Sequence, residues 1–153
     1  MTATLIITAQ DPASTLAQMM LKAHWAEIQR RYDLASSEGI PPHSFQVPRA
    51  GFWVALMGET PIGSVGLKPF SDHVAELSAM YVSPDYRGAG VAQNLMHALE
   101  THARQQAFVS IRLRAGGPQP EAVRFYAKMG FTPIDRYGQW SEDHSAWCFE
   151  KAL

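Results

Sequence analysis

The sequence predicts a single α/β (α+β) domain in which a mixed β-sheet is flanked by helices. Short runs rich in β-branched and aromatic residues alternate with longer segments whose apolar residues recur at helical spacing. Along the chain these segments give the order β-α-β-β-β-α-β-α-β-β, which is typical of a mixed sheet with helices packed against it. The 153 residues, 46% of them hydrophobic, are enough for one substantial core. We expect residues 1–153 to form one domain, because no repeat or linker interrupts them.

The first elements are a strand and a long helix. Thr4–Ala9 alternates weakly and is β-branched, which predicts a strand. Asp11 and Pro12 predict the start of a helix, as N-cap and first helical residue, and helical spacing continues to about residue 35. The stretch Ser36–Pro48 contains three prolines and predicts a loop or a broken short helix.

Three strands are predicted to follow in series. Phe52–Met57 is apolar and aromatic, and Gly58–Pro61 has the composition of a hairpin turn. Ile62–Phe70 is then the returning strand, and Val74–Val82 is a further strand.

The last third of the sequence alternates between helices and short strands. A helix is predicted from Val91 to about His102, and a second helix from Pro120 to Met129. Gly130 suits the position just after that second helix, where a left-handed residue is common. The predicted strands of this part are Val109–Leu113, Phe131–Ile134 and Ala146–Glu150, with Tyr137–Ser145 as a loop.

A glycine-containing loop, Arg87–Ala92, joins the strand that ends at Val82 to the next helix. A helix N-terminus presents free N–H groups and the positive end of the helix dipole, so it attracts anions. Gly88 and Gly90 permit positive φ and close approach of the backbone to a ligand, while Arg87 can fork onto a phosphate. The loop lacks the Lys-Ser/Thr pair of a P-loop and the third glycine of the dinucleotide fingerprint. A pyrophosphate site is therefore predicted, with a ligand-free turn as the alternative.

A second motif begins at Gln119 and reads Gln-Pro-Glu-Ala-Val-Arg-Phe-Tyr-Ala-Lys-Met-Gly-Phe. Together the two motifs resemble the GNAT superfamily of acetyl-CoA-dependent N-acetyltransferases. The Arg/Gln-x-x-Gly-x-Gly/Ala pattern of that superfamily falls on Arg87, Gly90 and Ala92. Its Asn-x-x-Ala-x-x-x-Tyr pattern, with a following Lys and Gly-Phe, falls on Gln119, Ala122, Tyr126, Lys128, Gly130 and Phe131. The resemblance covers roughly residues 50–153, and Gln119 stands where the family usually has Asn.

The resemblance implies a GNAT-like fold: a mixed, largely antiparallel central sheet of six to seven strands, flanked by about four helices. It also implies a bulged pair of strands that splay apart at the cofactor site, with acetyl-CoA as co-substrate and no metal. The residues implied to bind it are Met80, Tyr81, Val82, Arg87, Gly88, Ala89, Gly90, Val91, Ala92, Gln119, Tyr126 and Lys128. Gln has the amide of Asn one methylene further out, so the family's contact with the pantetheine arm or acyl end would have altered geometry.

The same resemblance implies direct transfer of an acetyl group to an amine, with Tyr126 and Glu76 as catalytic residues. A backbone N–H among Met80 to Val82 would stabilise the charge that develops on the thioester oxygen. Tyr126 would protonate the leaving thiolate, although its place on an apolar helical stripe is also typical of a packing residue. Glu76 would accept a proton from the amine, because its apolar neighbours disfavour the charged carboxylate. Alternation places Glu76 on the face of Met80 and Val82 unless a bulge resets the register, and an edge-exposed charge is the alternative reading of this residue.

Composition excludes several other classes of function. The net charge of −1, from 13 basic and 14 acidic residues, argues against a nucleic-acid partner. No apolar run approaches the roughly 18 residues of a membrane span, and the N-terminus lacks a signal peptide's basic region, so we expect no membrane partner and a cytoplasmic location. The lone Cys148 excludes an intrachain disulfide and is expected in a buried strand, and no metal-ligand spacing occurs among the histidines.

The amine acceptor is expected to belong to a small molecule or a peptide, and a homodimer is expected only by family analogy. A non-catalytic domain that binds acyl-CoA as a sensor or regulatory partner is the alternative function.

Overall fold

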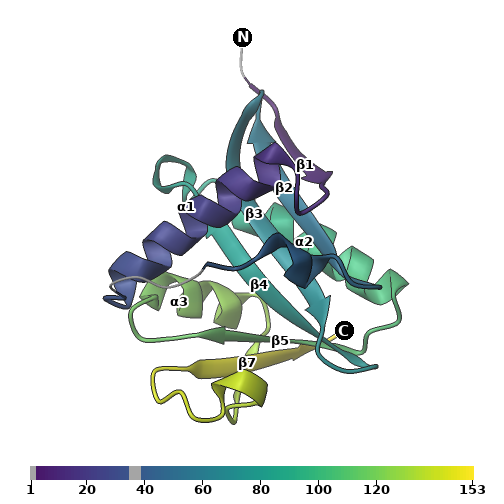
Figure 1. Cartoon of the computed structure of the whole chain (residues 1–153), viewed down its shortest axis with the longest axis vertical. Helices are drawn as coiled ribbons and strands as arrows, with labels where there is room; N and C mark the ends of the chain where they lie inside the picture. The colour runs from purple at the N-terminus through teal and green to yellow at the C-terminus, as the bar shows by residue number, and fades with distance from the viewer. Residues whose placement is uncertain (1–2, 35–38) are drawn as a thin grey trace.

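The computed structural model describes residues 3–34 and 39–153, and its described strands form one seven-stranded sheet in the order β1-β2-β3-β4-β5-β7-β6 (Figure 1). The strands are β1 (Leu5–Ala9), β2 (Gly51–Met57), β3 (Thr60–Pro69), β4 (Val74–Val82), β5 (Ser110–Ala115), β6 (Thr132–Ile134) and β7 (Trp147–Ala152). All neighbouring strands pair antiparallel except β4 and β5, which are parallel. The predicted mixed, largely antiparallel sheet is therefore confirmed.

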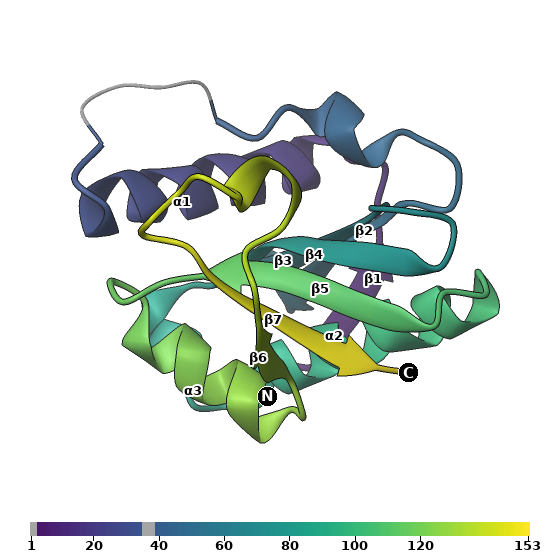
Figure 2. The same ribbon diagram turned by 90° about the horizontal axis from the view of Figure 1, so that it is seen from below.

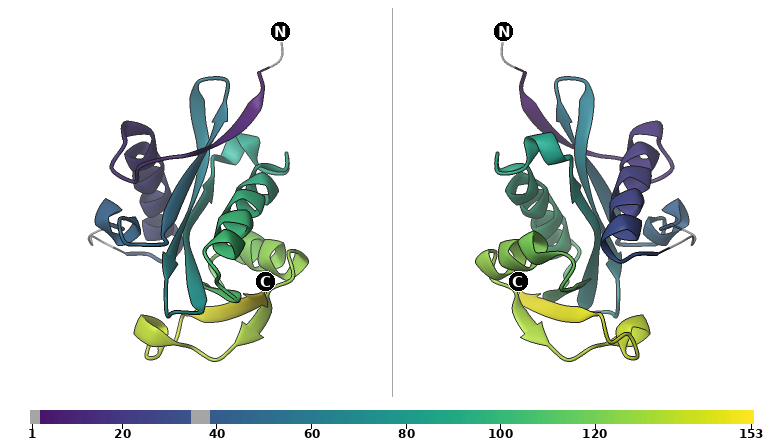
Figure 3. Two further views of the ribbon diagram at one scale, coloured as in Figure 1. Left: turned by 90° about the vertical axis from the view of Figure 1, so that its right-hand side faces the viewer. Right: turned by 90° about the vertical axis from the view of Figure 1, so that its left-hand side faces the viewer.

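Three α-helices cover the two faces of this sheet in the described part of the chain. Helix α1 (Thr15–Arg31) lies on one face, and α2 (Val91–Gln105) and α3 (Pro120–Lys128) lie on the other (Figure 3). The expected number was about four. The additional helical segments are single 3-10 turns at Pro42–Phe45, Pro84–Tyr86 and Gly138–Trp140. The first of these turns lies in the predicted loop Ser36–Pro48, of which residues 36–38 fall outside the described residues.

Helix α1 begins three residues later than the sequence predicts. Ser14 is its N-cap, and the Ser14 hydroxyl accepts a hydrogen bond from the Ala17 N–H at 3.2 Å. Asp11 instead closes a local turn, in which its carboxylate accepts from the Ala13 N–H at 2.8 Å. Asp and Ser are both strong N-caps, and because Asp11 closes this turn, the helix starts after Ser14. The helix ends at Arg31, four residues before the predicted end.

The ladder between β4 and β5 is short. It joins Val74–Glu76 to Ser110–Arg112 and then stops, although β4 continues to Val82 and β5 to Ala115. Beyond Glu76 the two strands diverge, and β5 pairs only with β7. The expected splayed strand pair is present, and it opens the sheet beside the glycine loop.

A β-bulge at Ala79 and Met80 interrupts the pairing of β3 with β4, at the start of the segment Met80 to Val82 in which the oxyanion-binding N–H is expected. Ser64 pairs with Tyr81 but Gly66 pairs with Ser78, so two residues of β4 oppose one of β3. Ala79, in the bulge, has a left-handed φ of 57°, and its carbonyl accepts from the Ser64 hydroxyl at 2.9 Å. The buried hydroxyl of Ser64 thereby satisfies a carbonyl that the bulge takes out of the ladder.

The bulge resets which side chains face which layer. Before it, Leu77 packs in the core under α2; after it, Met80 and Val82 pack against that same core, while Tyr81 packs under α1. Glu76, next to Leu77, therefore lies on the α1 face, opposite to Met80 and Val82. The simple alternation that placed the three residues on one face does not hold.

Candidate active site

The glycine loop leads directly into helix α2 in the way that an anion site requires. Gly88 and Gly90 have φ values of 80° and 82°, so the expected positive φ is present at both. Gly90 is the N-cap of α2 and contributes no side-chain cap, which leaves the first N–H groups of the helix free. A Cβ added at Gly88 would meet nothing within 4 Å, so the space above the loop is open.

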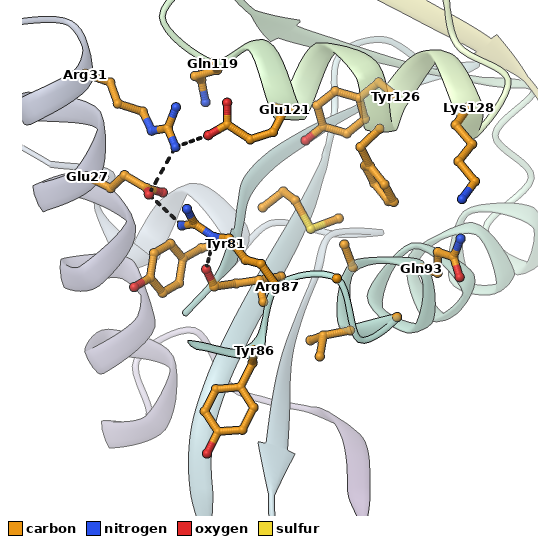
Figure 4. Close-up of a pocket in the computed structure, with 18 residues that line it drawn as sticks. Glu27, Arg31, Tyr81, Tyr86, Arg87, Gln93, Gln119, Glu121, Tyr126 and Lys128 are labelled. Atoms are coloured by element: carbon orange, nitrogen blue, oxygen red, sulfur yellow. Dashed lines mark hydrogen bonds and ion pairs between the residues drawn. The ribbon is translucent and has the colours of Figure 1, made fainter. Parts of the chain in front are cut away.

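A cavity of about 470 Å³ lies between this loop, the end of β4 and helix α3 (Figure 4). We call it the groove. All of the predicted cofactor-binding residues line the groove except Ala89. The groove is also lined by residues that the sequence did not single out as cofactor-binding: Glu27, Arg31, Tyr86, Gln93, Glu121, Ala122 and Phe125. The two from α1 could not be assigned from spacing, because charges on one side of a helix are usually solvated.

A chain of ion pairs joins α1, the glycine loop and α3 along one side of the groove (Figure 4). Arg87 donates to Glu27 Oε1 at 2.6 Å and to the Val82 carbonyl at 2.9 Å. Arg31 lies 3.6 Å from the same Glu27 oxygen and also pairs with Glu121. The hydrogen bond from Arg31 lowers the pKa of the Glu121 carboxyl. The predicted phosphate-binding Arg87 thus faces the groove with a carboxylate as its partner.

Tyr126 comes from α3 and is directed into the groove by its hydroxyl end (Figure 4). Its ring packs against Phe125 and Phe131, with ring centroids 5.5 and 5.6 Å apart. Burial raises the pKa of the Tyr126 phenol well above its usual value. The phenol is therefore a neutral hydrogen-bond donor at physiological pH. The ring of Tyr126 thus packs in the core, and its hydroxyl group faces the groove, so the packing and catalytic hypotheses concern different parts of the same side chain.

Gln119 lies directly before α3 and is half-buried in the wall of the groove. Its side-chain oxygen accepts a hydrogen bond from the Tyr32 hydroxyl at 2.6 Å. The guanidinium of Arg114 lies over the Tyr32 ring, 4.6 Å from its centroid. Burial raises the pKa of the Tyr32 phenol, so this hydroxyl also stays protonated and donates. The amide that replaces the family's Asn is thus already bound to the protein through its oxygen.

A second cavity, of about 350 Å³, meets the groove. We call it the inner cavity. Residues of α1 and of the turn Gly138–Trp140 both line it, on the face of the sheet that α1 covers. Figure 2 shows that the loop between β6 and β7 extends toward this same face. Met80, Gln119 and Tyr126 line both the groove and the inner cavity. Two molecules bound in the two cavities would therefore meet at these three side chains.

Glu76 lines the inner cavity and is 7% exposed. Its Oε2 accepts from the Tyr137 hydroxyl at 2.7 Å and from the Trp140 indole N–H at 3.3 Å, and Lys68 Nζ lies 3.6 Å from its Oε1. Burial, and then the Glu76 charge, raise the pKa of the Tyr137 phenol. Glu76 is not an edge-exposed charge. Its surroundings also differ from the apolar ones that the strand sequence suggests, because its partners come from β3 and from the loop before β7.

Two further side chains of the inner cavity, His24 and Arg114, each have a buried nitrogen without a hydrogen-bond partner among the described residues. These atoms are Nδ1 of His24 and Nε of Arg114. Burial lowers the pKa of His24 to about 4, against a smaller opposing effect of the Glu27 charge. His24 is thus a neutral imidazole at pH 7. Arg114 holds Asp143 at 3.0 Å and the Ser145 hydroxyl at 2.8 Å through its Nη2. Both residues were outside the predicted site.

Metal chemistry has no evident location in the described residues 3–34 and 39–153. No three side chains of the His, Cys, Asp and Glu types gather there in a way that could hold an ion. Cys148 is buried in β7, as expected. No helix in this described part of the chain has the length and apolar character needed to cross a membrane.

Comparison with known sequences identifies an acetyltransferase family and relatives that are named N-acetyltransferases. Residues 17–131 match the model of the Acetyltransferase (GNAT) family. N-acetyltransferase 8 of Rattus norvegicus is 32% identical over 109 residues, which is 68% of this chain and 48% of the relative. The probable N-acetyltransferase family 8 member 5 of Mus musculus is 29% identical over 140 residues, 88% of this chain and 56% of the relative. The chain spans about half the length of the curated relatives it matches.

Solved structures share the whole fold at low sequence identity. A GNAT-family acetyltransferase of Staphylococcus aureus superposes with a TM-score of 0.83 at 16% identity, covering 98% of this chain and 99% of the other. The PaiA N-acetyltransferase of Thermoplasma acidophilum, solved with coenzyme A, gives a TM-score of 0.73 at 20% identity, with coverage of 98% and 99%. The family match includes the bulged strand, the glycine loop and the motif of α3, and the chain belongs to the acetyltransferase (GNAT) family.

Proposed function

We propose that the protein is an N-acetyltransferase that moves an acetyl group from acetyl-CoA directly to a primary amine of a small molecule or peptide. The observation that carries the proposal is the junction of the groove and the inner cavity at Met80, Gln119 and Tyr126. One cavity ends at a helix N-terminus suited to a pyrophosphate, and the other contains a buried carboxylate suited to an ammonium group. The acetyl group of acetyl-CoA and the amine would therefore meet beside the phenol of Tyr126.

The residues of the groove fit acetyl-CoA. Gly88 and Gly90 leave room for a diphosphate against the backbone, and the N–H groups from Gly90 to Ala92 point to it from the start of α2. Arg87 reaches the same diphosphate by exchanging Glu27 for it, and Lys128 adds a second positive charge to the wall. Met80, Tyr81 and Val82 also line the groove, and Met80 belongs to the junction. When bound, acetyl-CoA supplies an activated acyl carbon, on which the C–N bond forms as the C–S bond breaks.

The chain's own residues then handle the charges and protons of the transfer. Backbone groups of Met80 to Val82 lie where β4 has left β5, so an N–H there is free to stabilise negative charge on the carbonyl oxygen. Tyr126 gives its phenolic proton to the departing sulfur, which its protonated state at neutral pH allows. Glu76 attracts the ammonium form of the acceptor into the inner cavity and takes up the proton that the ammonium loses before its nitrogen attacks. The second proton, which the nitrogen loses as the amide forms, restores the phenol of Tyr126.

A thiol-release assay with a panel of amines tests this function. The panel contains alkylamines, diamines, amino acids and peptides with a free N-terminus or lysine, each supplied with acetyl-CoA. Release of CoA thiol that depends on one class of amine, with a product whose mass is increased by one acetyl group, is the expected result. Tight binding of acetyl-CoA without thiol release on any amine would favour the sensor instead. The homodimer and the cytoplasmic location stay predictions from family analogy and from the sequence.

A further inference from the structure

We propose that Tyr32 is a positioning residue, which holds the side-chain amide of Gln119 so that its N–H groups face the junction of the groove and the inner cavity. The inference rests on the proposed function, because the junction is where the acyl end of acetyl-CoA would lie. Tyr32 lies just after α1, far from both sequence motifs, and no spacing rule points to it.

The hydrogen bond itself sets the orientation of the amide. Tyr32 donates to Gln119 Oε1 at 2.6 Å, so the carbonyl end of the side chain is directed toward the protein. An amide has one acceptor end and one donor end, and fixing the first leaves the NH₂ as the end available to a ligand. Gln119 lines both cavities, so this NH₂ group can serve a carbonyl at their junction. A free glutamine would lose more side-chain freedom on binding a ligand.

Tyr32 is itself held from two sides. Arg114 covers its ring at 4.6 Å from the centroid, and Asp143 and Ser145 hold that guanidinium in turn. Below the hydroxyl lies Gly116, where an added Cβ would come within 2.5 Å of the Tyr32 oxygen. The absence of a side chain at Gly116 therefore provides the space that the hydroxyl occupies.

The arrangement also explains how a Gln can replace the family's usual Asn. The extra methylene carries the amide oxygen to Tyr32, and the hydrogen bond removes the mobility that the longer side chain adds. An Asn at position 119 would end one methylene short of this hydroxyl. The tyrosine and the glutamine thus form one unit, with the tyrosine acting only through the glutamine.

The test compares Tyr32→Phe, Gln119→Ala, Gln119→Glu and the Tyr32→Phe/Gln119→Ala double variant. Acetyl-CoA affinity is measured by calorimetry, and kcat and KM by thiol release with the amine that the panel identifies. Loss of one neutral hydrogen bond predicts that Tyr32→Phe weakens acetyl-CoA binding or lowers kcat/KM by about three- to tenfold. Gln119→Glu keeps an acceptor for Tyr32 but has no N–H donor, so it is expected to lose as much as Gln119→Ala. In the Gln119→Ala background, Tyr32→Phe has no further effect.

Two glycine variants test the space around the Tyr32 hydroxyl. A Cβ in Gly116→Ala would lie 2.5 Å from this hydroxyl and 2.7 Å from the Ser145 backbone carbonyl, so this variant is expected to lose at least as much as Tyr32→Phe. Gly117→Ala is the matched control, because its Cβ would only touch Trp147 at 3.5 Å. Unchanged affinity and kcat/KM in Tyr32→Phe, or full additivity with Gln119→Ala, would overturn the assignment. A wild-type protein that fails to bind acetyl-CoA would instead contradict the proposed function.

Discussion

Tyr126 places a protonated phenol at the junction of the groove and the inner cavity, with its ring fixed between Phe125 and Phe131. Tyr126→Phe keeps this packing and removes only the hydroxyl group. We expect kcat to fall by about 10²-fold while acetyl-CoA affinity changes little, because a general acid acts in the transition state. Thiol-release kinetics and calorimetry measure the two quantities. Wild-type turnover in this variant would exclude Tyr126 as the acid.

Glu76 is the second residue whose removal has a defined outcome. Glu76→Gln retains an oxygen for the Tyr137 and Trp140 donors but loses the charge and the proton-accepting role. We expect kcat/KM to fall by about 10²-fold and the acidic limb of the pH–rate profile to flatten. Glu150→Gln is the matched control, since it removes the charge of another carboxylate, which pairs with Arg112 of β5 at 2.5 Å, and Glu150 does not line either cavity. An unaltered pH–rate profile in Glu76→Gln would remove the residue as base.

The sequence was enough to propose individual site residues, but not to predict which side chains they contact. Tyr126 and Gly90 belong to local motifs, so a few neighbouring positions are enough to find them. Glu76 depends on Tyr137 and Trp140, which are 61 and 64 positions away in the sequence. Such a pair forms only when the loop before β7 folds back over the sheet, and no local pattern encodes that contact.

The glycine loop is the element whose geometry is most specific, because Gly88 and Gly90 both have left-handed φ. Gly88→Ala or Gly90→Ala is expected to cost about 1 kcal/mol of unfolding free energy, since an L side chain is strained there. Acetyl-CoA affinity should fall as well, because a Cβ would project into the diphosphate site. Gly58→Ala is the control: it has a φ of 62° in the hairpin between β2 and β3 and lines neither cavity. Equal affinity in all three variants, measured by calorimetry beside urea unfolding, would argue against the diphosphate site.

The ion-pair chain between α1 and the glycine loop predicts opposite effects of its two members. Arg87→Ala should weaken acetyl-CoA binding by about tenfold or more, through loss of a charge-assisted contact. Glu27→Gln should strengthen it, because Arg87 no longer has to leave a carboxylate at 2.6 Å to reach the diphosphate. Calorimetry at low and high salt checks both, since the effect of Arg87 should shrink as salt screens it. An unchanged dissociation constant in Arg87→Ala would refute the phosphate contact.

Among the elements, the bulge was expected from the family resemblance, but its left-handed residue was not. The backbone N–H that faces the thioester oxygen was expected among Met80 to Val82, and the bulge falls on Ala79 and Met80, with the positive φ at Ala79. Nothing in the strand marks Ala79, because alanine rarely takes this conformation by preference. The position is set instead by the pairing of β3 on the other side and by the buried Ser64 hydroxyl.

For the whole molecule, His24 makes stability depend on pH. Its pKa is about 4 in the folded protein and about 6.5 when unfolded. Between these values the unfolded chain binds a proton that the folded chain does not, so stability falls as pH drops from 6.5 toward 4. The loss amounts to about 3 kcal/mol in total. His24→Gln should remove this part of the pH dependence in urea unfolding, and exposed His97→Gln should not. Parallel pH dependence in wild type and His24→Gln would contradict the assignment.

The order of elements along the chain could be predicted, but their order across the sheet could not. Hydrophobic periodicity identifies each strand and helix locally, and the observed strands agree within about three residues. The insertion of β7 between β5 and β6 depends on long-range pairing, as does the division of the helices between the two faces. The inner cavity is built from α1, the strands and the turn before β7 together, so it exists only in the complete fold.

Because the ladder between β4 and β5 ends early, the residues around the acceptor can change while the residues around the acyl donor are kept. Donor and acceptor would occupy two cavities lined by largely different residues, and among the described residues only Met80, Gln119 and Tyr126 line both. Substitutions at Trp25, Lys68 or Trp140 would alter the acceptor's surroundings without touching the glycine loop. Substitutions could thus change which amine is accepted while the same acyl donor is still bound. The parting of two strands after Glu76 is then the feature that makes this scaffold adaptable.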